Sequence, residues 1–239
     1  MTIRIILLTS YITFSYLHIM AQSSKSALND QQKSMIIISM LTAKGDLKEL
    51  KKELSIGLDA GLTIHKIKEC LVHAYAYCGF PRSIRGLQTL MEVLEERKSK
   101  GIADAEGAPA SDIEHIKSKY ERGRDNLEKL SGAPKDAPKA GYAVFSPEIE
   151  VMLKEHLFAD LFDRDVLTYA ERELVTISVI SAIGNAEPML KSHLNISLKN
   201  GISPDQLHEF IQVIHKSVGK KEAKAAKKVL QEVLNQKSK

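Results

Sequence analysis

Apolar residues along most of the chain recur every three to four positions, the spacing of one face of an α-helix. In the second half, Thr168 and Glu171 have capping-box spacing and precede an apolar run that ends near Gly184. Pro188 stands in the first turn of the next predicted helix, which ends at Asn200-Gly201. The same pattern predicts further helices over about 31–43, 46–59, 63–78, 81–98, 111–130 and 147–162, from 203 onward, and over about 221–234.

The chain repeats itself at an offset of 140 residues. Thirteen positions between 37 and 94 match their counterparts, namely Ile37/Ile177, Leu50/Leu190, Lys51/Lys191, Leu54/Leu194, Ile56/Ile196, Leu58/Leu198, Gly61/Gly201, Glu69/Glu209, Gly79/Gly219, Leu90/Leu230, Glu92/Glu232, Val93/Val233 and Leu94/Leu234. The offset exceeds a solenoid period, so it indicates a duplicated domain. We assign residues 22–100 to the first repeat, 101–146 to a linker with a charged helix, and 147–239 to the second repeat.

Composition supports an all-α fold of two tandem helical domains. The chain has 239 residues, 44% of them hydrophobic, with 13 Gly, 7 Pro and no Trp. These values exclude disordered, collagen-like and disulfide-stapled chains. The few turn-forming residues disfavour a sandwich or a barrel.

The net charge of +4 comes from one end of the chain. Residues 219–239 carry seven Lys against Glu222 and Glu232, so the rest is about neutral. The basic segment lacks aromatic residues, which nucleic-acid binders usually interleave with their cations. We therefore expect a solvated helix face and no nucleic-acid partner.

The first 21 residues have the features of a secretory signal peptide. Arg4 precedes an uncharged stretch, 5–17, and Ala21 offers a small residue for cleavage. The stretch is short for a bilayer span, which needs about 20 apolar residues. We expect export, to the periplasm, without stable membrane insertion after cleavage; the alternative is a cytoplasmic protein with an apolar N-terminal helix.

Cys70 and Cys78 are the two cysteines and fall on one predicted helix. Eight residues at about 1.5 Å each place their Cα atoms about 12 Å apart, whereas a disulfide needs less than about 7 Å. We expect no internal disulfide, and no zinc-ligand spacing is present.

Several motifs resemble those of one known family. They are Arg172-Glu173 opening a helix, His193 eight residues before Gly201, Gly61-Leu62-Thr63, and the run from Tyr77 to Arg82. With them the chain resembles the carboxymuconolactone decarboxylase family, the superfamily that includes alkylhydroperoxidase D, over nearly everything after residue 27. The resemblance implies helical hairpins that bury their faces on assembly, and members that are trimers or hexamers. A tandem chain resembles two fused subunits, so we expect a homotrimer with pseudo-hexameric packing.

The peroxidase branch of this family uses a Cys-x-x-Cys pair just before the histidine. The corresponding positions here are Ala186 and Met189. Without a thiolate there is no nucleophile for peroxide. The sequence therefore disfavours peroxiredoxin activity.

The decarboxylase branch needs neither a metal nor an organic cofactor. Loss of CO2 from a carboxylated lactone leaves a dienolate, which must be stabilised and then protonated at carbon. The resemblance implies an Arg for the carboxylate, a His for the proton and a carboxylate that orients the His, which Arg172, Glu173 and His193 would supply. We therefore favour a carboxy-lyase-like enzyme for a small carboxylated substrate.

The two repeats differ in a complementary way. Arg172, Glu173 and His193 fall on Gln32, Lys33 and Glu53, while Tyr77, Cys78, Phe80 and Pro81 fall on Ser217, Val218, Lys220 and Lys221. We expect one composite site per chain, with the polar trio from the second repeat and a substrate-binding wall from a neighbouring first repeat. The candidate wall residues are His73, Tyr77, Phe80 and Arg82.

Each of these residues also has a structural interpretation. Arg172 and Glu173 could belong to an ordinary first helical turn, and His193 could be a half-buried, hydrogen-bonded residue. His73 could be a packed interface histidine, and Gly79-Phe80-Pro81 a simple break between helices. The alternative function is a non-catalytic exported oligomer that binds a small carboxylated ligand.

Overall fold

The computed structural model describes residues 26–113, 116–139 and 141–237, and these residues contain helices and no strand. The all-α prediction is confirmed. In chain order the elements are α2 Asp30–Lys44, α3 Leu47–Asp59, α4 Ile64–Ser99, α5 Lys119–Ser131, α6 Gly141–Phe145, α7 Pro147–Met152, η1 Leu153–Leu161, α8 Tyr169–Ile183, α9 Glu187–Lys199, α10 Pro204–Ser217 and α11 Lys220–Lys237.

The helices of the two halves correspond one to one at the predicted offset. Helix α3 falls on α9, and the two arms of α4 fall on α10 and α11. The arms of α4 meet at Gly79, whose φ of 82° breaks the helical geometry. Such a positive φ is strained for residues with a Cβ, so a glycine suits this kink.

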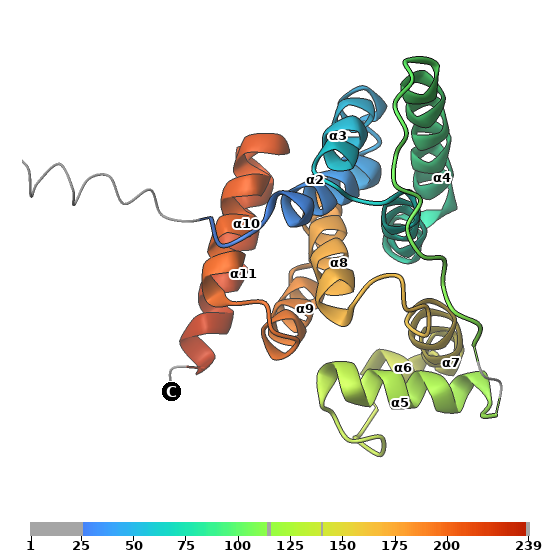
Figure 1. Cartoon of the computed structure of the whole chain (residues 1–239). Helices are drawn as coiled ribbons and strands as arrows, with labels where there is room; N and C mark the ends of the chain where they lie inside the picture. Colours follow the sequence, from blue (N-terminus) through green and yellow to red (C-terminus); the bar gives the residue numbers. More distant parts are fainter. Residues whose placement is uncertain (1–25, 114–115, 140, 238–239) are drawn as a thin grey trace, which may run out of the picture.

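The two repeats share their core. Helices α2 and α8 pack against each other in the middle of the molecule (Figure 1). One buried cluster joins Ile36 and Met40 of α2 to α8–α11, and a second joins Val175 and Val179 of α8 to α2–α4. Each repeat therefore completes the core of the other, as a helix buried on all sides must.

The charged helix of the linker is shorter than predicted. Helix α5 begins at Lys119 instead of near residue 111, because Ser118 and Glu121 form a capping box there. Upstream, the backbone oxygens of Ala105 and Glu106 accept hydrogen bonds from the N–H groups of Ile64 and His65. The linker thus satisfies the free donors at the start of α4.

The segment that opens the second repeat, predicted as one helix over about 147–162, is not a uniform α-helix. It begins as α7 and continues as η1, a π-helix that packs against α5. The approach is close at Gly123, where a Cβ would lie 1.8 Å from the carbonyl oxygen of Lys154. A glycine is required there because the two backbones touch.

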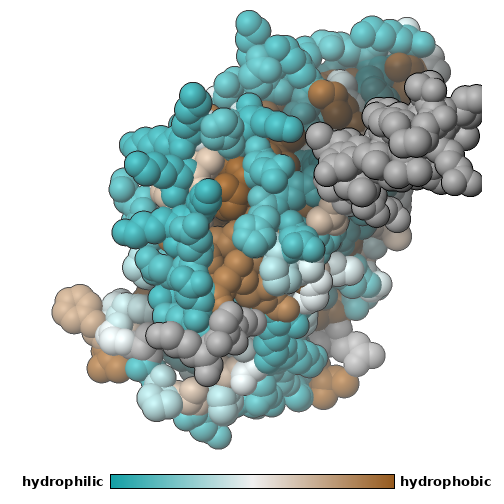
Figure 2. Space-filling view, turned by 90° about the vertical axis from the view of Figure 1, so that its left-hand side faces the viewer, coloured by the Kyte–Doolittle hydropathy of each residue, from teal (hydrophilic) through white to brown (hydrophobic). Residues whose placement is uncertain are grey.

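The surface over α11 bears out the solvated basic face. Lys221, Lys224 and Lys228 are exposed, while Ala226 and Val229 are buried. Figure 2, which looks onto the side of the molecule where α10 and α11 lie, shows hydrophilic side chains over much of this face and an apolar strip between them.

The predicted signal peptide, residues 1–21, lies outside the described residues. Among those the structure describes, no helix is long and apolar enough to cross a membrane. Both cysteines are free, as their separation along the helix predicted.

Candidate functional site

Helix α8 carries the candidate polar residues into the interior. Every residue from Arg172 to Ser181 is buried, since α8 packs against α2, α4 and α9. Successive residues of an α-helix point about 100° apart. Arg172 and Glu173 therefore meet different neighbours, and they form two distinct polar groups.

The first group is the pair that the sequence predicted. Nδ1 of His193, on α9, lies 2.9 Å from Oε2 of Glu173. An ionised carboxylate can only accept, so Nδ1 carries the proton and donates it, which leaves Nε2 of the imidazole free. Glu173 is fully buried, whereas 15% of the His193 side chain is exposed. Nε2 of His193 is therefore the ring nitrogen that a substrate could meet, and the buried carboxylate of Glu173 lies on the opposite, Nδ1 side of the ring.

Tyr77, from α4 of the first repeat, stands beside this pair. Its ring lies edge-on to the ring of His193, with centroids 6.0 Å apart. Burial, and after it the charge of Glu173, raises the pKa of Tyr77 above its usual value, so its hydroxyl stays protonated. The hydroxyl approaches Thr176 without reaching hydrogen-bond geometry.

Two buried polar atoms at this site lack partners among the described residues. They are Oη of Tyr77 and Oε1 of Glu173. Buried polar atoms in proteins are almost always hydrogen-bonded, so an exception needs an explanation. A substrate or water beside His193 would supply partners for both.

The second group surrounds Arg172. Its Nη2 lies 2.8 Å from Oε1 of Glu69 and donates to the backbone oxygen of Arg164 at 2.5 Å, and its Nη1 lies 3.1 Å from Nδ1 of His73. Arg164 also binds Glu69, through two nitrogens at 2.9–3.0 Å. Arg172 is thus an interior ion-pair partner of Glu69; its predicted contact with a substrate carboxylate stays a prediction.

The same group fixes the state of His73. Because Nδ1 accepts from Arg172, the ring proton sits on Nε2, which lies 3.0 Å from Oγ1 of Thr176. Burial, followed by the positive charges of Arg172 and His193, holds the pKa of His73 well below its usual value. His73 is a neutral, fully buried residue that packs 5.4 Å from the ring of Tyr77.

The remaining two predicted wall residues lie elsewhere. Phe80 is 63% exposed and stacks on Tyr75 with centroids 4.5 Å apart. The guanidinium of Arg82 covers Gly45, at the end of α2. The kink at Gly79 turns both side chains outward, and their roles in substrate binding stay predictions.

The corresponding positions in the first repeat carry no such pair. Lys33 lies 3.5 Å from Glu209, a residue of the other repeat. Glu53 is half-buried, and burial raises the pKa of its carboxyl. Within the described residues, no group of three or more His, Cys, Asp or Glu side chains could hold a metal ion.

Comparison with protein families gives one match. The sequence model of the carboxymuconolactone decarboxylase family matches residues 13–92 and 147–232. The two matched segments correspond to the two repeats, and the first begins inside the predicted signal peptide. No curated protein matches the chain.

Proposed function

This chain belongs to the carboxymuconolactone decarboxylase family, and on that premise we propose that it releases CO2 from a small carboxylated lactone, with Glu173 and His193 as an acid–base pair. The observation that carries the proposal is the 2.9 Å contact between Nδ1 of His193 and the buried carboxylate of Glu173. A buried carboxylate orients the imidazole and stabilises its protonated form.

The reaction needs one proton transfer to carbon. The bond between the lactone ring and its carboxylate breaks, CO2 leaves, and the electron pair enters the conjugated lactone as a dienolate. Protonated His193 then delivers the proton on Nε2 to carbon, and solvent restores it for the next turnover. The hydroxyl of Tyr77, protonated and without a partner, would donate to the developing enolate oxygen.

Arg172 enters this proposal as a positioning residue. It is buried and bound to Glu69 and His73, so it acts on the pair through the placement of α4 against α8. Recognition of the substrate carboxylate then falls to groups other than Arg172. Phe80 and Arg82 remain candidates if they meet the site of another copy of the chain.

The environment of the thiols argues against a peroxidase. Burial raises the pKa of Cys70 to about 12 and that of Cys78 to about 11. At neutral pH both are therefore protonated and poor nucleophiles. Ala186 and Met189 occupy the positions where the peroxidase branch carries its cysteines.

The proposal is tested by CO2 release from carboxymuconolactone. We expect His193→Ala and Glu173→Gln each to lower kcat by a factor of about 10²–10⁴, the usual contribution of a positioned acid or base, while Tm changes little. His215→Ala is the matched control, because His215 is exposed on α10, and it should keep full activity. Unchanged turnover in either site variant would refute the assignment.

The assay also addresses the alternative function. A non-catalytic protein would release no CO2 from the wild-type chain, yet it would bind the carboxylated lactone saturably. Loss of that binding in Glu173→Gln would then assign the Glu173–His193 pair to ligand capture.

We propose further that the chain forms a homotrimer. Large apolar side chains stand exposed on the first repeat, among them Ile56, Ile84 and Met91. A mainly apolar groove of about 390 Å³ runs along α4 past Leu87, Leu90 and Met91. Light scattering during size-exclusion chromatography should give three times the chain mass; a monomer at micromolar concentration would contradict the proposal.

A further inference from the structure

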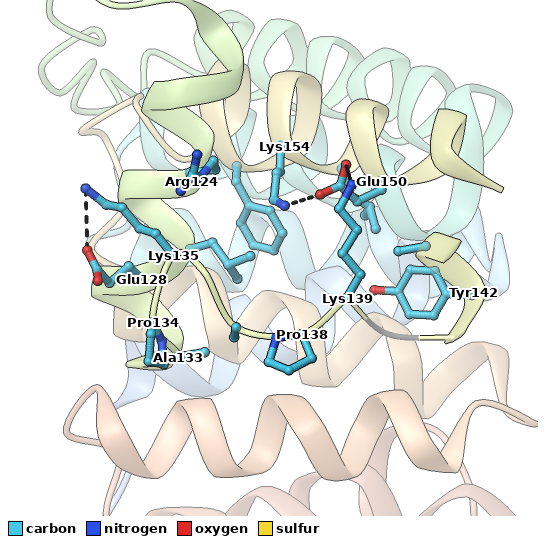
Figure 3. Close-up of a pocket in the computed structure, with 15 residues that line it drawn as sticks. Arg124, Glu128, Ala133, Pro134, Lys135, Pro138, Lys139, Tyr142, Glu150 and Lys154 are labelled. Atoms are coloured by element: carbon cyan, nitrogen blue, oxygen red, sulfur yellow. Dashed lines mark hydrogen bonds and ion pairs between the residues drawn. The ribbon is translucent and has the colours of Figure 1, made fainter. Parts of the chain in front are cut away.

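A cavity of about 200 Å³ lies between α5, residues 133–139 and 142–143, and the α7–η1 segment. We call it the insert pocket, because residues 124–143 of its lining lie outside both segments that match the family. Its volume is several times what one ordered water needs. Figure 3 shows its lining.

One wall of the insert pocket depends on the π-helix. Leu153 and Phe158 both line it. In an α-helix, side chains five residues apart point about 140° away from each other, whereas i→i+5 bonding brings them onto one side. The unusual helix therefore supplies an apolar wall, facing Leu127 of α5.

The other side chains of the pocket carry charges of both signs. Four cations, Arg124, Lys135, Lys139 and Lys154, line it with two carboxylates, Glu128 and Glu150. Arg124 and Lys135 also pair with Asp136 and Asp125, outside the lining. In Figure 3, Lys139 and Lys154 both point toward Glu150, while Arg124 and Lys135 lie across the cavity.

The cationic end around Glu150 has an uncompensated charge. Lys154 pairs with Glu150, and Lys139 lies 3.7 Å from the same carboxylate. Glu150 also accepts from the hydroxyl of Tyr120 at 2.9 Å. Only 16% of the Lys154 side chain is exposed. Two ammonium groups share one carboxylate in a partly desolvated place, where an added anion is stabilised more strongly than in water.

From this geometry we infer that the insert pocket binds a small monocarboxylic acid with an apolar body. The carboxylate would sit between Lys139 and Lys154, and the body would pack on Leu127, Leu153 and Phe158. The site is separate from the Glu173–His193 pair and does not depend on the proposed reaction.

Benzoate is the probe, with benzamide as its uncharged counterpart and acetate as the anion without an apolar body. Calorimetric titration of the full chain should show saturable benzoate binding, with benzamide about tenfold weaker and acetate weaker still. In amide spectra, benzoate should shift signals of α5 and η1. Equal affinity for benzoate and benzamide would overturn the inference.

Variants locate the site. Lys154→Met and Lys139→Met should each lower the affinity for benzoate about tenfold. The Lys139 side chain is 53% exposed, so this variant should fold even if the Lys154 variant does not. Lys129→Met, exposed on α5 and outside the pocket, is the matched control and should bind as the wild type does. Equal binding by the Lys139 and Lys129 variants would count against the pocket.

A second comparison separates this site from the candidate active site. His193→Ala should keep the wild-type affinity for benzoate, whether or not it retains activity. Loss of benzoate binding in that variant would place the probe at the Glu173–His193 pair and overturn the inference.

Discussion

Replacement of Arg172 by Met tests whether the interior ion pair holds the two repeats together. The substitution keeps an unbranched side chain in α8 and removes the guanidinium from Glu69, whose side chain is 2% exposed. Glu69 would retain only Arg164, which is 38% exposed. Breaking a buried pair from one side costs about 3–5 kcal/mol, because the other charge stays buried.

Urea unfolding measures this loss. With a slope of about 3 kcal/mol per M for a chain of this size, the midpoint should fall by about 1–1.7 M. Arg164→Met is the matched control on the same carboxylate, and we expect it to cost only about 1–2 kcal/mol, because water can replace the lost partner.

A double variant completes the test. Glu69→Gln combined with Arg172→Met removes both charges, so its loss of stability should be smaller than the sum of the two single losses, by about 1 kcal/mol or more. If Arg172→Met stays within about 1 kcal/mol of the wild type, the interior pair is not a stabilising contact. Loss of activity at unchanged stability would instead return Arg172 to direct contact with substrate.

Two further predictions concern pH and the packing of the insert. Burial holds the pKa of His73 well below its usual value in the folded state, so below about pH 6.5 the unfolded chain takes up a proton at this residue before the folded chain does. The free energy of unfolding should therefore fall as the pH drops from about 6.5, by at most about 1.4 kcal/mol per pH unit. His73→Gln should lack this component in urea unfolding at different pH values, and an equal pH dependence of the wild type and the variant would contradict the prediction. Gly123→Ala would place a methyl group 1.8 Å from the Lys154 carbonyl oxygen, so it should cost about 1–3 kcal/mol and speed hydrogen exchange in α5, whereas Lys129→Ala should do neither.

The helix boundaries could be predicted where capping residues mark them. Thr168 caps α8 as expected, and α10 begins where the pattern predicted, with Ser203 as its cap. The predicted start of α5 is wrong although Ser118 and Glu121 carry the same signal, because the charged pattern continues upstream of this cap. The π-helix could not be predicted, since apolar spacing does not distinguish i→i+4 from i→i+5 bonding.

The contact between Glu173 and His193 was accessible from sequence because α8 and α9 are consecutive helices of one repeat and pack against each other. The direction of Arg172 was not, although a 100° turn per residue already separates it from Glu173. Its partner Glu69 stands 103 residues away on α4. A long-range pair of this kind depends on how the repeats cross, which periodicity within one repeat does not reveal.

One glutamate that is duplicated at the repeat offset shows which contacts both repeats keep. Glu69 and Glu209 are identical at the repeat offset, and each binds the segment that leads into the other repeat. Glu69 holds Arg164, before α8, and Glu209 accepts from the hydroxyl of Ser26 at 2.6 Å and the N–H of Leu28 at 2.9 Å, before α2. Both halves need this contact, because α2 and α8 are each buried against the opposite repeat.

The Glu173–His193 pair does not make such a contact between the repeats, so packing does not require it in both halves. His193 meets Glu173 within one repeat, while the counterpart Lys33 contacts Glu209 of the other repeat and the counterpart Glu53 is half-buried. A contact that crosses the repeats is needed twice in every chain, whereas an acid–base pair inside one repeat is needed only where a substrate reaches it. The asymmetry of the polar residues on a symmetric scaffold is therefore what one functional site in a duplicated fold should produce.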